Sequence, residues 1–369
     1  MSWWKGYAGE SRGTVKNFPG FDPDKDAEVL YEAMDGFGKS AFLMSYRATA
    51  FYFKPVRLFS SWTIALNKWL KQFHLCYFLS GTDESAITNV LTRRSNAQRQ
   101  RIAQAYKDNY GQDLIEDLKS EISGGFAMLI DALMCPPVKY DVQEIHYALT
   151  GAGTSEDILI EILASRSGDH LHQLVKTYEE EYEVTLEEEI RADTSGYFEK
   201  VLVSLLQGNR DHPHLVDEDL VHEDAQTLFD AGEKITGTNE TKFITILCTR
   251  SVPHLWRVFQ EYKKLGDKDL EEAIQSEMTG TLEDTILAIV KCTKCAPTYF
   301  AERLYNAMSG GGTEERTLTR IMVTRSEIDM KDIIIKFKQK YEQSLASMIE
   351  SDTSGDFERT LLKLCGKDG

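Results

Sequence analysis

Apolar residues recur every three to four positions along most of the chain, and the same pattern returns four times. The four copies align on Gly-Thr pairs that end at Thr82, Thr154, Thr238 and Thr313. Apolar residues stand five, eight and nine positions after each threonine, where they form one face of an α-helix. Arginine always stands twelve positions after it, and an acid opening an acid-x-Ser/Thr-Gly pattern always stands 39 positions after it. Four aligned copies indicate a protein built from helical repeats.

Further helical segments follow within each copy, for example LHQLVKTYEEEY (171–182) and YFEKVLVSLLQ (197–207). Proline is rare, with eight in 369 residues, and no Asn-Gly hairpin signal occurs. Threonine is a good helix N-cap, so we expect each Gly-Thr pair to open a helix with the threonine as its cap. We therefore predict an all-α chain of four repeats, each with about five helices.

Composition shifts suggest where the repeats begin and end. The polar, Pro-containing stretch GNRDHPHLVDEDL (208–220) makes the second and third copies lie further apart than the third and fourth. We expect, in chain order, an N-terminal tail over 1–20, repeat one over 21–135, repeat two over 136–208, a linker over 209–218, repeat three over 219–295, and repeat four over 296–369.

The first copy is interrupted. In repeats two and four an apolar residue stands eight positions before the last glycine of the turn. In repeat one, Leu30 stands eight positions before Gly38 but 51 before Gly81, so an insertion of 43 residues covers 39–81. It carries six basic residues, no acid and 11 aromatic residues.

Two interpretations of residues 39–81 remain open. Basic and aromatic residues suit a bilayer interface, so the segment is one candidate for membrane contact. The alternative is translated non-coding sequence, a splice product with impaired function. We favour the second because helical periodicity is poor and Pro55 interrupts it.

The net charge of −17 excludes simple electrostatic binding to nucleic acid. The same charge repels anionic lipid unless a cation bridges the two surfaces. The sequence shows no signal-peptide pattern and no apolar run of 18 residues, so we predict no transmembrane helix. Six scattered cysteines without a disulfide-type spacing favour a reducing cytosol.

The glycine-rich turn before each threonine has a possible chemistry. Alternating glycines permit backbone conformations that direct several carbonyl oxygens to one point, and an acid 40 residues after the last glycine completes an oxygen cage. Calcium prefers such carbonyl and carboxylate ligands. For one copy alone, a plain helix-to-helix turn is the better explanation of the glycines. The fourfold pairing of the turn with a remote acid favours calcium.

These motifs resemble those of the annexin family. The resemblance rests on Gly-x-Gly-Thr, the later acid and the Thr/Ser-Arg-Ser segment, and it covers the chain apart from 39–81. It implies four repeats in a curved disc with calcium sites on the convex face. The ligands that it implies are carbonyl oxygens of Leu149, Gly151 and Gly153 with the carboxylate of Asp193; Gly232, Ile235 and Gly237 with Glu277; Met308, Gly310 and Gly312 with Asp352; and, in a site weakened or abolished by the insertion, Met34, Gly36 and Gly38 with Glu121.

The resemblance also implies a function. It implies calcium-dependent, peripheral binding of a cytoplasmic protein to anionic, phosphatidylserine-like membranes, with lateral self-association there. It further implies anticoagulant or phospholipase A2-inhibiting action through covering phospholipid.

Two other functional classes explain the sequence less well. A calcium-independent helical-repeat adaptor explains the helices but gives the turns and acids no role. A hydrolase needs a nucleophile and a base that converge on a pocket, and we recognise no such set. The one Gly-x-Ser-x-Gly spacing, at residues 9–13, lies in the N-terminal tail outside the repeats, so we predict that the chain is not an enzyme. The four repeated arginines we expect to be structural, bonding helix-end carbonyls or carboxylates.

Overall fold

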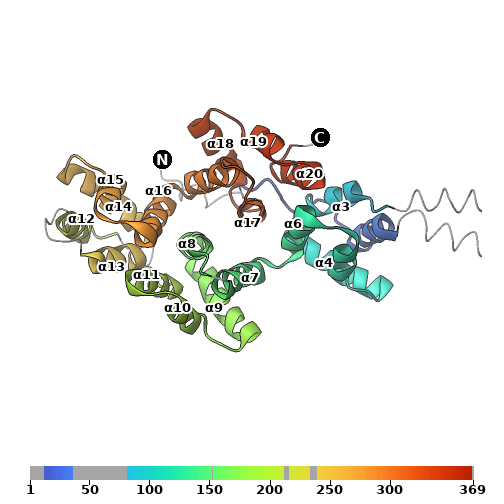
Figure 1. Ribbon diagram of the computed structural model, residues 1–369, viewed down its shortest axis with the longest axis horizontal. Helices are drawn as coiled ribbons and strands as arrows, with labels where there is room; N and C mark the ends of the chain where they lie inside the picture. The colour runs from blue at the N-terminus through green and yellow to red at the C-terminus, as the bar shows by residue number, and fades with distance from the viewer. Residues whose placement is uncertain (1–11, 36–80, 152, 212–215, 233–238, 368–369) are drawn as a thin grey trace, which may run out of the picture. The chain divides into compact units, whose positions relative to one another are not determined.

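The computed structural model describes residues 12–35, 81–151, 153–211, 216–232 and 239–367. Every regular element within these ranges is a helix, and none of these residues lies in a strand (Figure 1). The prediction of an all-α chain is therefore confirmed. No described helix has the length and apolar character that crossing a bilayer requires.

The helices form two compact units, which are described separately. Unit 1 comprises Met1–Arg12, Pro137–Gly310 and Lys331–Ser344, and unit 2 comprises Gly13–Pro136, Gly311–Met330 and Leu345–Gly369. Each unit therefore combines segments that are distant in the sequence. The first and last parts of the chain fold together in unit 2 because the apolar faces of their helices cover one another, as α17 and α20 do on α6.

Unit 2 begins with five helices that follow one another in the chain. An α-helix over residues 23–35 precedes residues 36–80, and α3 (Glu84–Leu91), α4 (Asn96–Tyr110), α5 (Leu114–Glu121) and α6 (Gly124–Met134) follow them in the chain. Three helices from the C-terminal part complete it: α17 (Glu315–Arg325), α19 (Leu345–Asp352) and α20 (Gly355–Leu364).

Unit 1 contains two further groups of helices. The first group is α7 (Pro137–Thr150), α8 (Glu156–Ser165), α9 (Gly168–Tyr182), α10 (Leu186–Asp193) and α11 (Gly196–Leu206). The second group is α12 (Glu218–Gly232), α13 (Glu240–Thr249), α14 (Val252–Leu265), α15 (Leu270–Glu277) and α16 (Gly280–Met308), and α18 (Met330–Tyr341) lies almost wholly in this unit. Non-helical backbone at Cys295 (φ −167°, ψ 92°) divides α16 into two helices, two residues before Pro297.

The apolar positions of the repeat pattern form the cores of both units. Five positions after the threonine, Ile87, Leu159, Phe243 and Leu318 are each at most 1% exposed. The residues at positions eight and nine are buried as well, at no more than 8% exposed. Since full burial of one such side chain contributes about 1.5–3 kcal/mol, the repeated helix face accounts for a large share of the stability of each unit.

The repeated arginines are structural, as predicted. In repeats one to three, the guanidinium pairs with a buried aspartate of the first helix of the same repeat. Repeat four has Phe300 at the corresponding sequence position, and Arg325 pairs instead with Asp329, four residues later in the chain. The pairs are Arg94–Asp26, Arg166–Asp141, Arg250–Asp224 and Arg325–Asp329, with closest N–O distances of 2.6, 2.7, 2.7 and 2.6 Å.

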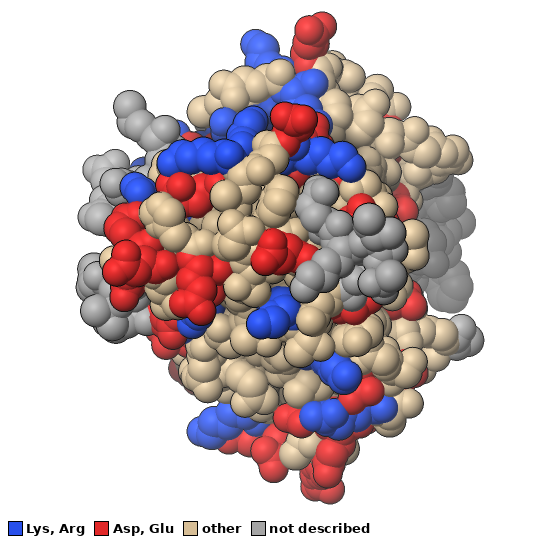
Figure 2. Space-filling view, turned by 90° about the vertical axis from the view of Figure 1, so that its left-hand side faces the viewer, with Lys and Arg blue, Asp and Glu red and all other residues tan. Residues whose placement is uncertain are grey.

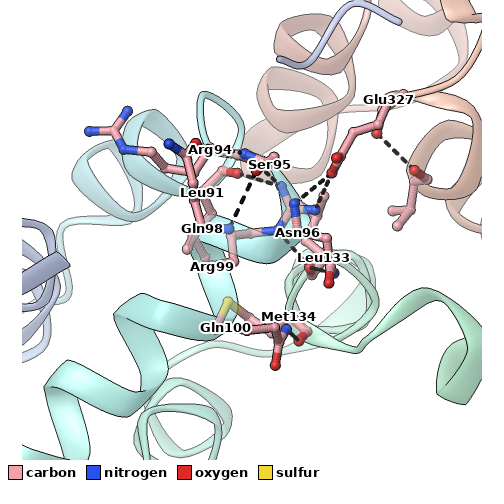
Figure 3. A network of polar contacts seen from close by, with 12 residues as sticks. Leu91, Arg94, Ser95, Asn96, Gln98, Arg99, Gln100, Leu133, Met134 and Glu327 are labelled. Atoms are coloured by element: carbon pink, nitrogen blue, oxygen red, sulfur yellow. Dashed lines mark hydrogen bonds and ion pairs between the residues drawn. The ribbon is translucent and has the colours of Figure 1, made fainter. Parts of the chain in front are cut away.

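A second buried arginine organises unit 2 (Figure 3). Arg99 is 1% exposed, and its guanidinium donates to the carbonyl oxygens of Leu133 and Leu91 and to the carboxylate of Glu327. Burial lowers the pKa of Arg99 to about 10, although the nearby carboxylate of Glu327 opposes that shift. Because Glu327 also accepts from the backbone N–H of Asn96 at 2.6 Å, it ties the start of α4 to the segment that follows α17.

Charge is unevenly distributed on the side of the molecule where α12, α14 and α15 lie in Figure 1. Figure 2 shows the largest group of acidic side chains at the left of this side, and basic side chains mainly toward its top and bottom. The net charge of −17 is therefore not spread as an unbroken negative surface here.

Candidate functional site

In the three repeats whose turn threonine is described, this threonine reaches the remote acid. In each case the hydroxyl donates to a carboxylate oxygen 39 residues later in the chain. The contacts are Thr82 Oγ1 to Glu121 Oε2 at 3.0 Å, Thr154 Oγ1 to Asp193 Oδ2 at 2.5 Å, and Thr313 Oγ1 to Asp352 Oδ2 at 2.7 Å. The sequence offset of 39 residues thus corresponds to direct contact between turn and acid.

The expected role of these threonines as N-caps is wrong. The helix after the turn begins one residue later, with Asp83 as the N-cap of α3 and Ser155 as the N-cap of α8. The Asp83 carboxylate accepts from the N–H of Ala86 at 2.9 Å, as a capping side chain does. The threonine hydroxyl is therefore available to donate to the acid, a role that only the tertiary contact reveals.

The turn of repeat two joins α7 to α8 in unit 1. Leu149 lies in the last turn of α7, and Gly153 has φ +121°, a conformation that favours glycine. A side chain at Gly151 would stand 3.3 Å from the carbonyl oxygen of Gly153, so the backbone folds back tightly on itself. Asp193 ends α10 and is exposed. Turn backbone and carboxylate are thus neighbours at an open surface.

In repeat four, the residues that belong to unit 2 have the same arrangement of turn threonine and acid. Asp352 ends α19, and its backbone carbonyl and its carboxylate both accept from the Thr313 hydroxyl, at 2.9 and 2.7 Å. Gly312 belongs to the same unit, whereas Met308 and Gly310 belong to unit 1.

The acids of repeats one and four line one hollow of about 420 Å³ in unit 2. Its lining includes Glu84, Glu121, Glu315, Asp352 and Asp356, and no Lys or Arg. Asp356 is bonded to Arg359 beside the hollow. The structure therefore brings together two sequence-predicted acids that are 231 positions apart in the chain.

Repeat one keeps its geometry on both sides of residues 36–80, which lie outside the described residues. The N–H of Asp83 donates to the carbonyl of Ala33 at 2.9 Å, although 49 residues separate them. In repeat two, the N–H of Ser155 donates to the carbonyl of Ala148 at 3.0 Å in the same way. Met34 is buried next to this bond, whereas the predicted ligands at positions 36 and 38 lie outside the described residues.

Repeat three is described only in part. Gly232 ends α12, and Glu277 ends α15 with its side chain exposed. These two helices contact one another. The predicted ligands Ile235 and Gly237 lie outside the described residues.

The donor set suits a hard cation held largely by backbone. Within the described part of the chain, no three or more His, Cys, Asp or Glu side chains form a cluster that could hold a metal ion. Each predicted site supplies one carboxylate, so the other protein ligands there have to be carbonyl oxygens of the turn. Calcium accepts such mixed oxygen ligands and completes its shell with water or another oxygen donor.

Comparison with known proteins identifies four matching segments. The family profile described as Annexin matches residues 76–133, 140–205, 223–289 and 299–364. Annexin A8 of Homo sapiens, the eighth annexin or vascular anticoagulant-beta, is 48% identical over 369 residues, covering 100% of both chains. Segments such as MSWWK at the N-terminus and FITILCTRS (243–251) predict a similarity to this relative.

Solved structures agree. The structure named annexin III superimposes with a TM-score of 0.83 at 42% identity, covering 98% of each chain. The calcium-bound structure of annexin (Sm)1 gives a TM-score of 0.77 at 29% identity, covering 97% of this chain and 93% of that one. The predicted family and the predicted repeat fold are both confirmed by these matches. This chain belongs to the annexin family, whose members bind calcium.

Proposed function

We propose that this chain docks peripherally on anionic, phosphatidylserine-like membranes when calcium rises. The family to which it belongs is consistent with calcium-dependent phospholipid binding. The observation that carries the proposal is the repeated contact of a turn threonine with a remote carboxylate, seen in repeats one, two and four. Calcium on such an open turn keeps coordination positions that lipid phosphate can fill, which lets a protein of charge −17 approach an anionic surface.

The proposed ligands follow from the same arrangement. The carboxylates are Asp193, Glu277 and Asp352, with Glu121 in a weaker site of repeat one, and the carbonyl ligands are those of the glycine-rich turns. Repeat one is the weakest candidate because the insertion separates Gly38 from Gly81, so its turn is not one short rigid loop.

The proposal also covers the physiological role of the chain and its location in the cell. We propose a non-enzymatic cytoplasmic protein that covers phospholipid, associates laterally on it, and in that way inhibits coagulation or phospholipase A2. Covering phospholipid hides the surface that other proteins need, so this role would follow from membrane binding alone. The proposed repeat boundaries are 21–135, 136–208, 219–295 and 296–369, and the kink of α16 at Cys295 supports the last of them.

Co-sedimentation with phosphatidylserine vesicles tests membrane docking. The full chain and a variant lacking 39–81 are each sedimented in calcium and in chelator. We expect both to pellet only in calcium, because repeats two to four retain their turns and acids. Pelleting of the folded full chain in chelator, but not of the deletion variant, would make the insertion a membrane anchor in its own right.

Calorimetric titration with calcium tests the sites without lipid. We expect binding heat at sub-millimolar calcium. A folded chain that gives no heat there would contradict the calcium proposal and support a calcium-independent adaptor.

A further inference from the structure

An aromatic and a basic side chain stand beside the proposed site of repeat two. Tyr197 lies in the first turn of α11, four residues after Asp193, and is 38% exposed. The ammonium group of Lys200 lies 4.8 Å from the centroid of the Tyr197 ring, within the range of a cation–π contact. The two side chains therefore form one exposed pair that follows closely in the chain on Asp193, the acid that Thr154 contacts.

The charge of Lys200 is available to an external anion. The described residues place no carboxylate within ion-pair distance of its ammonium group. Arg191, nearby in the chain, is by contrast engaged with Glu187 at 2.8 Å and Glu199 at 2.6 Å. In an acidic protein, an unpaired lysine beside a proposed calcium site gives local attraction to anionic phosphate.

The pair is particular to repeat two. Position 197 corresponds to Gly125, Thr281 and Asp356 in repeats one, three and four, and position 200 corresponds to Met128, Asp284 and Arg359. Repeat four also has a cation there, but Arg359 is bonded to Asp356. Only repeat two combines an exposed aromatic ring with an unpaired cation at these positions.

We propose that Tyr197 and Lys200 contact the headgroup region of an anionic phospholipid bilayer directly, beside the calcium ion that Asp193 would hold. The ring lies in the interfacial layer, where amphipathic aromatic side chains are favoured, and the ammonium group binds a lipid phosphate. The proposal rests on the proposed function, because calcium first brings this surface to the membrane. The proposed ligand is a bilayer rather than a soluble phosphate, because a phosphate ion in water offers no interfacial layer in which the ring could be buried.

Vesicle binding of the full chain tests the pair. Binding to phosphatidylserine-containing vesicles is measured at saturating calcium for the wild type, Tyr197→Ala and Lys200→Ala. We expect Lys200→Ala to bind about fivefold more weakly, the change that corresponds to ~1 kcal/mol for one lysine near an anionic surface, with a smaller dependence on salt. We expect Tyr197→Ala to weaken binding by about the same factor, because both the ring and its contact with Lys200 are lost.

Two controls separate this contact from calcium binding and from general charge. The calorimetric calcium affinity without vesicles should match the wild type in both variants. Lys176→Ala removes an exposed lysine of α9 that already pairs with Glu180, and it should bind vesicles like the wild type. If both Tyr197→Ala and Lys200→Ala bind like a competent wild type, this inference alone is overturned; if the wild type fails to bind in calcium, the proposed function falls as well.

A tryptophan variant tests the same contact through a gain of signal, so loss of binding through a damaged fold cannot be mistaken for a result. Tyr197→Trp should add tryptophan fluorescence. Brominated phosphatidylserine should quench the fluorescence of this variant more strongly than that of the wild type. Ile335→Trp, at a 46% exposed position of α18, a helix that carries no proposed calcium ligand, should add emission that is not quenched. Equal quenching of both variants, or of neither, would contradict a specific contact at residue 197.

Discussion

The buried carboxylate of Asp141 in α7 holds together the helices that carry the proposed site of repeat two. Asp141 is 1% exposed, and Arg166 at the end of α8 donates two hydrogen bonds to it, at 2.7 and 2.8 Å. The ring nitrogen Nε2 of His170 in α9 lies 2.8 Å from the same carboxylate. The far end of α7 carries Leu149, so this contact also positions one proposed calcium ligand.

Replacing Asp141 by Asn keeps the size of the side chain but removes its charge. The guanidinium of Arg166, whose side chain is 5% exposed, then loses its charged contact with this carboxylate in a buried place. Removing one partner of such a pair costs about 3–5 kcal/mol. That is a large part of the about 5–15 kcal/mol by which a folded domain is stable, so Asp141→Asn should strongly destabilise unit 1.

The effect should depend on pH in a defined direction. Burial alone would raise the pKa of Asp141, but the charge of Arg166 and the hydrogen bonds from Arg166 and His170 outweigh it and hold the pKa well below its usual range. A carboxyl with a depressed folded-state pKa stabilises the fold above its unfolded pKa, about 4, and loses that contribution as the pH falls below it. The difference between wild type and Asp141→Asn should therefore shrink below about pH 4.

Urea unfolding followed by far-ultraviolet circular dichroism measures this difference at several pH values. Glu180→Gln is the matched control, because it breaks an exposed pair with Lys176 in the same unit and should cost less than about 1 kcal/mol. An Asp141→Asn variant as stable as this control at pH 7, or a difference that grows on acidification, would refute the reasoning.

Three further predictions concern single positions. Asp193→Asn and Asp352→Asn should each remove part of the calcium heat in calorimetry, whereas a heat unchanged in both would leave these carboxylates without the proposed role. Gly168→Ala should lower the free energy of unfolding by about 1–3 kcal/mol, because a Cβ there would stand 2.3 Å from the carbonyl oxygen of Gly208; a thermal melt like the wild type would contradict this. Burial raises the pKa of the Cys248 thiol to about 11 despite nearby Arg210, so iodoacetamide at pH 8 should modify it only after unfolding, as peptide mass spectrometry can test.

Much of the fold could be predicted because the repeat pattern is local. Helix faces, the buried positions after each threonine and the structural arginines all follow from spacing along one helix, and the structure contains them. The pairing of turn with acid was likewise visible as a constant offset of 39 residues. A fixed offset within a repeat corresponds to a fixed distance because each repeat folds in the same way.

Hydrogen-bond partners were harder to predict than positions. Threonine was expected to cap its helix, but its hydroxyl donates to the acid instead, because the capping role is taken by the next residue. The partner of Arg325 likewise differs from those of the other repeated arginines, although Phe300 in place of an acid was a signal that the sequence contained.

The sequence by itself determined the helices, the repeat and the residue types at the proposed sites, since these depend on propensity and periodicity within short segments. Only the tertiary structure decided which segments meet. It joined the two ends of repeat one through the bond from Asp83 to Ala33, and it placed the acids Glu121 and Asp352 around one hollow. Such contacts depend on how apolar faces from distant parts of the chain cover one another, and loop-closure entropy grows so slowly with loop length that the 49 residues between Ala33 and Asp83 do not prevent them.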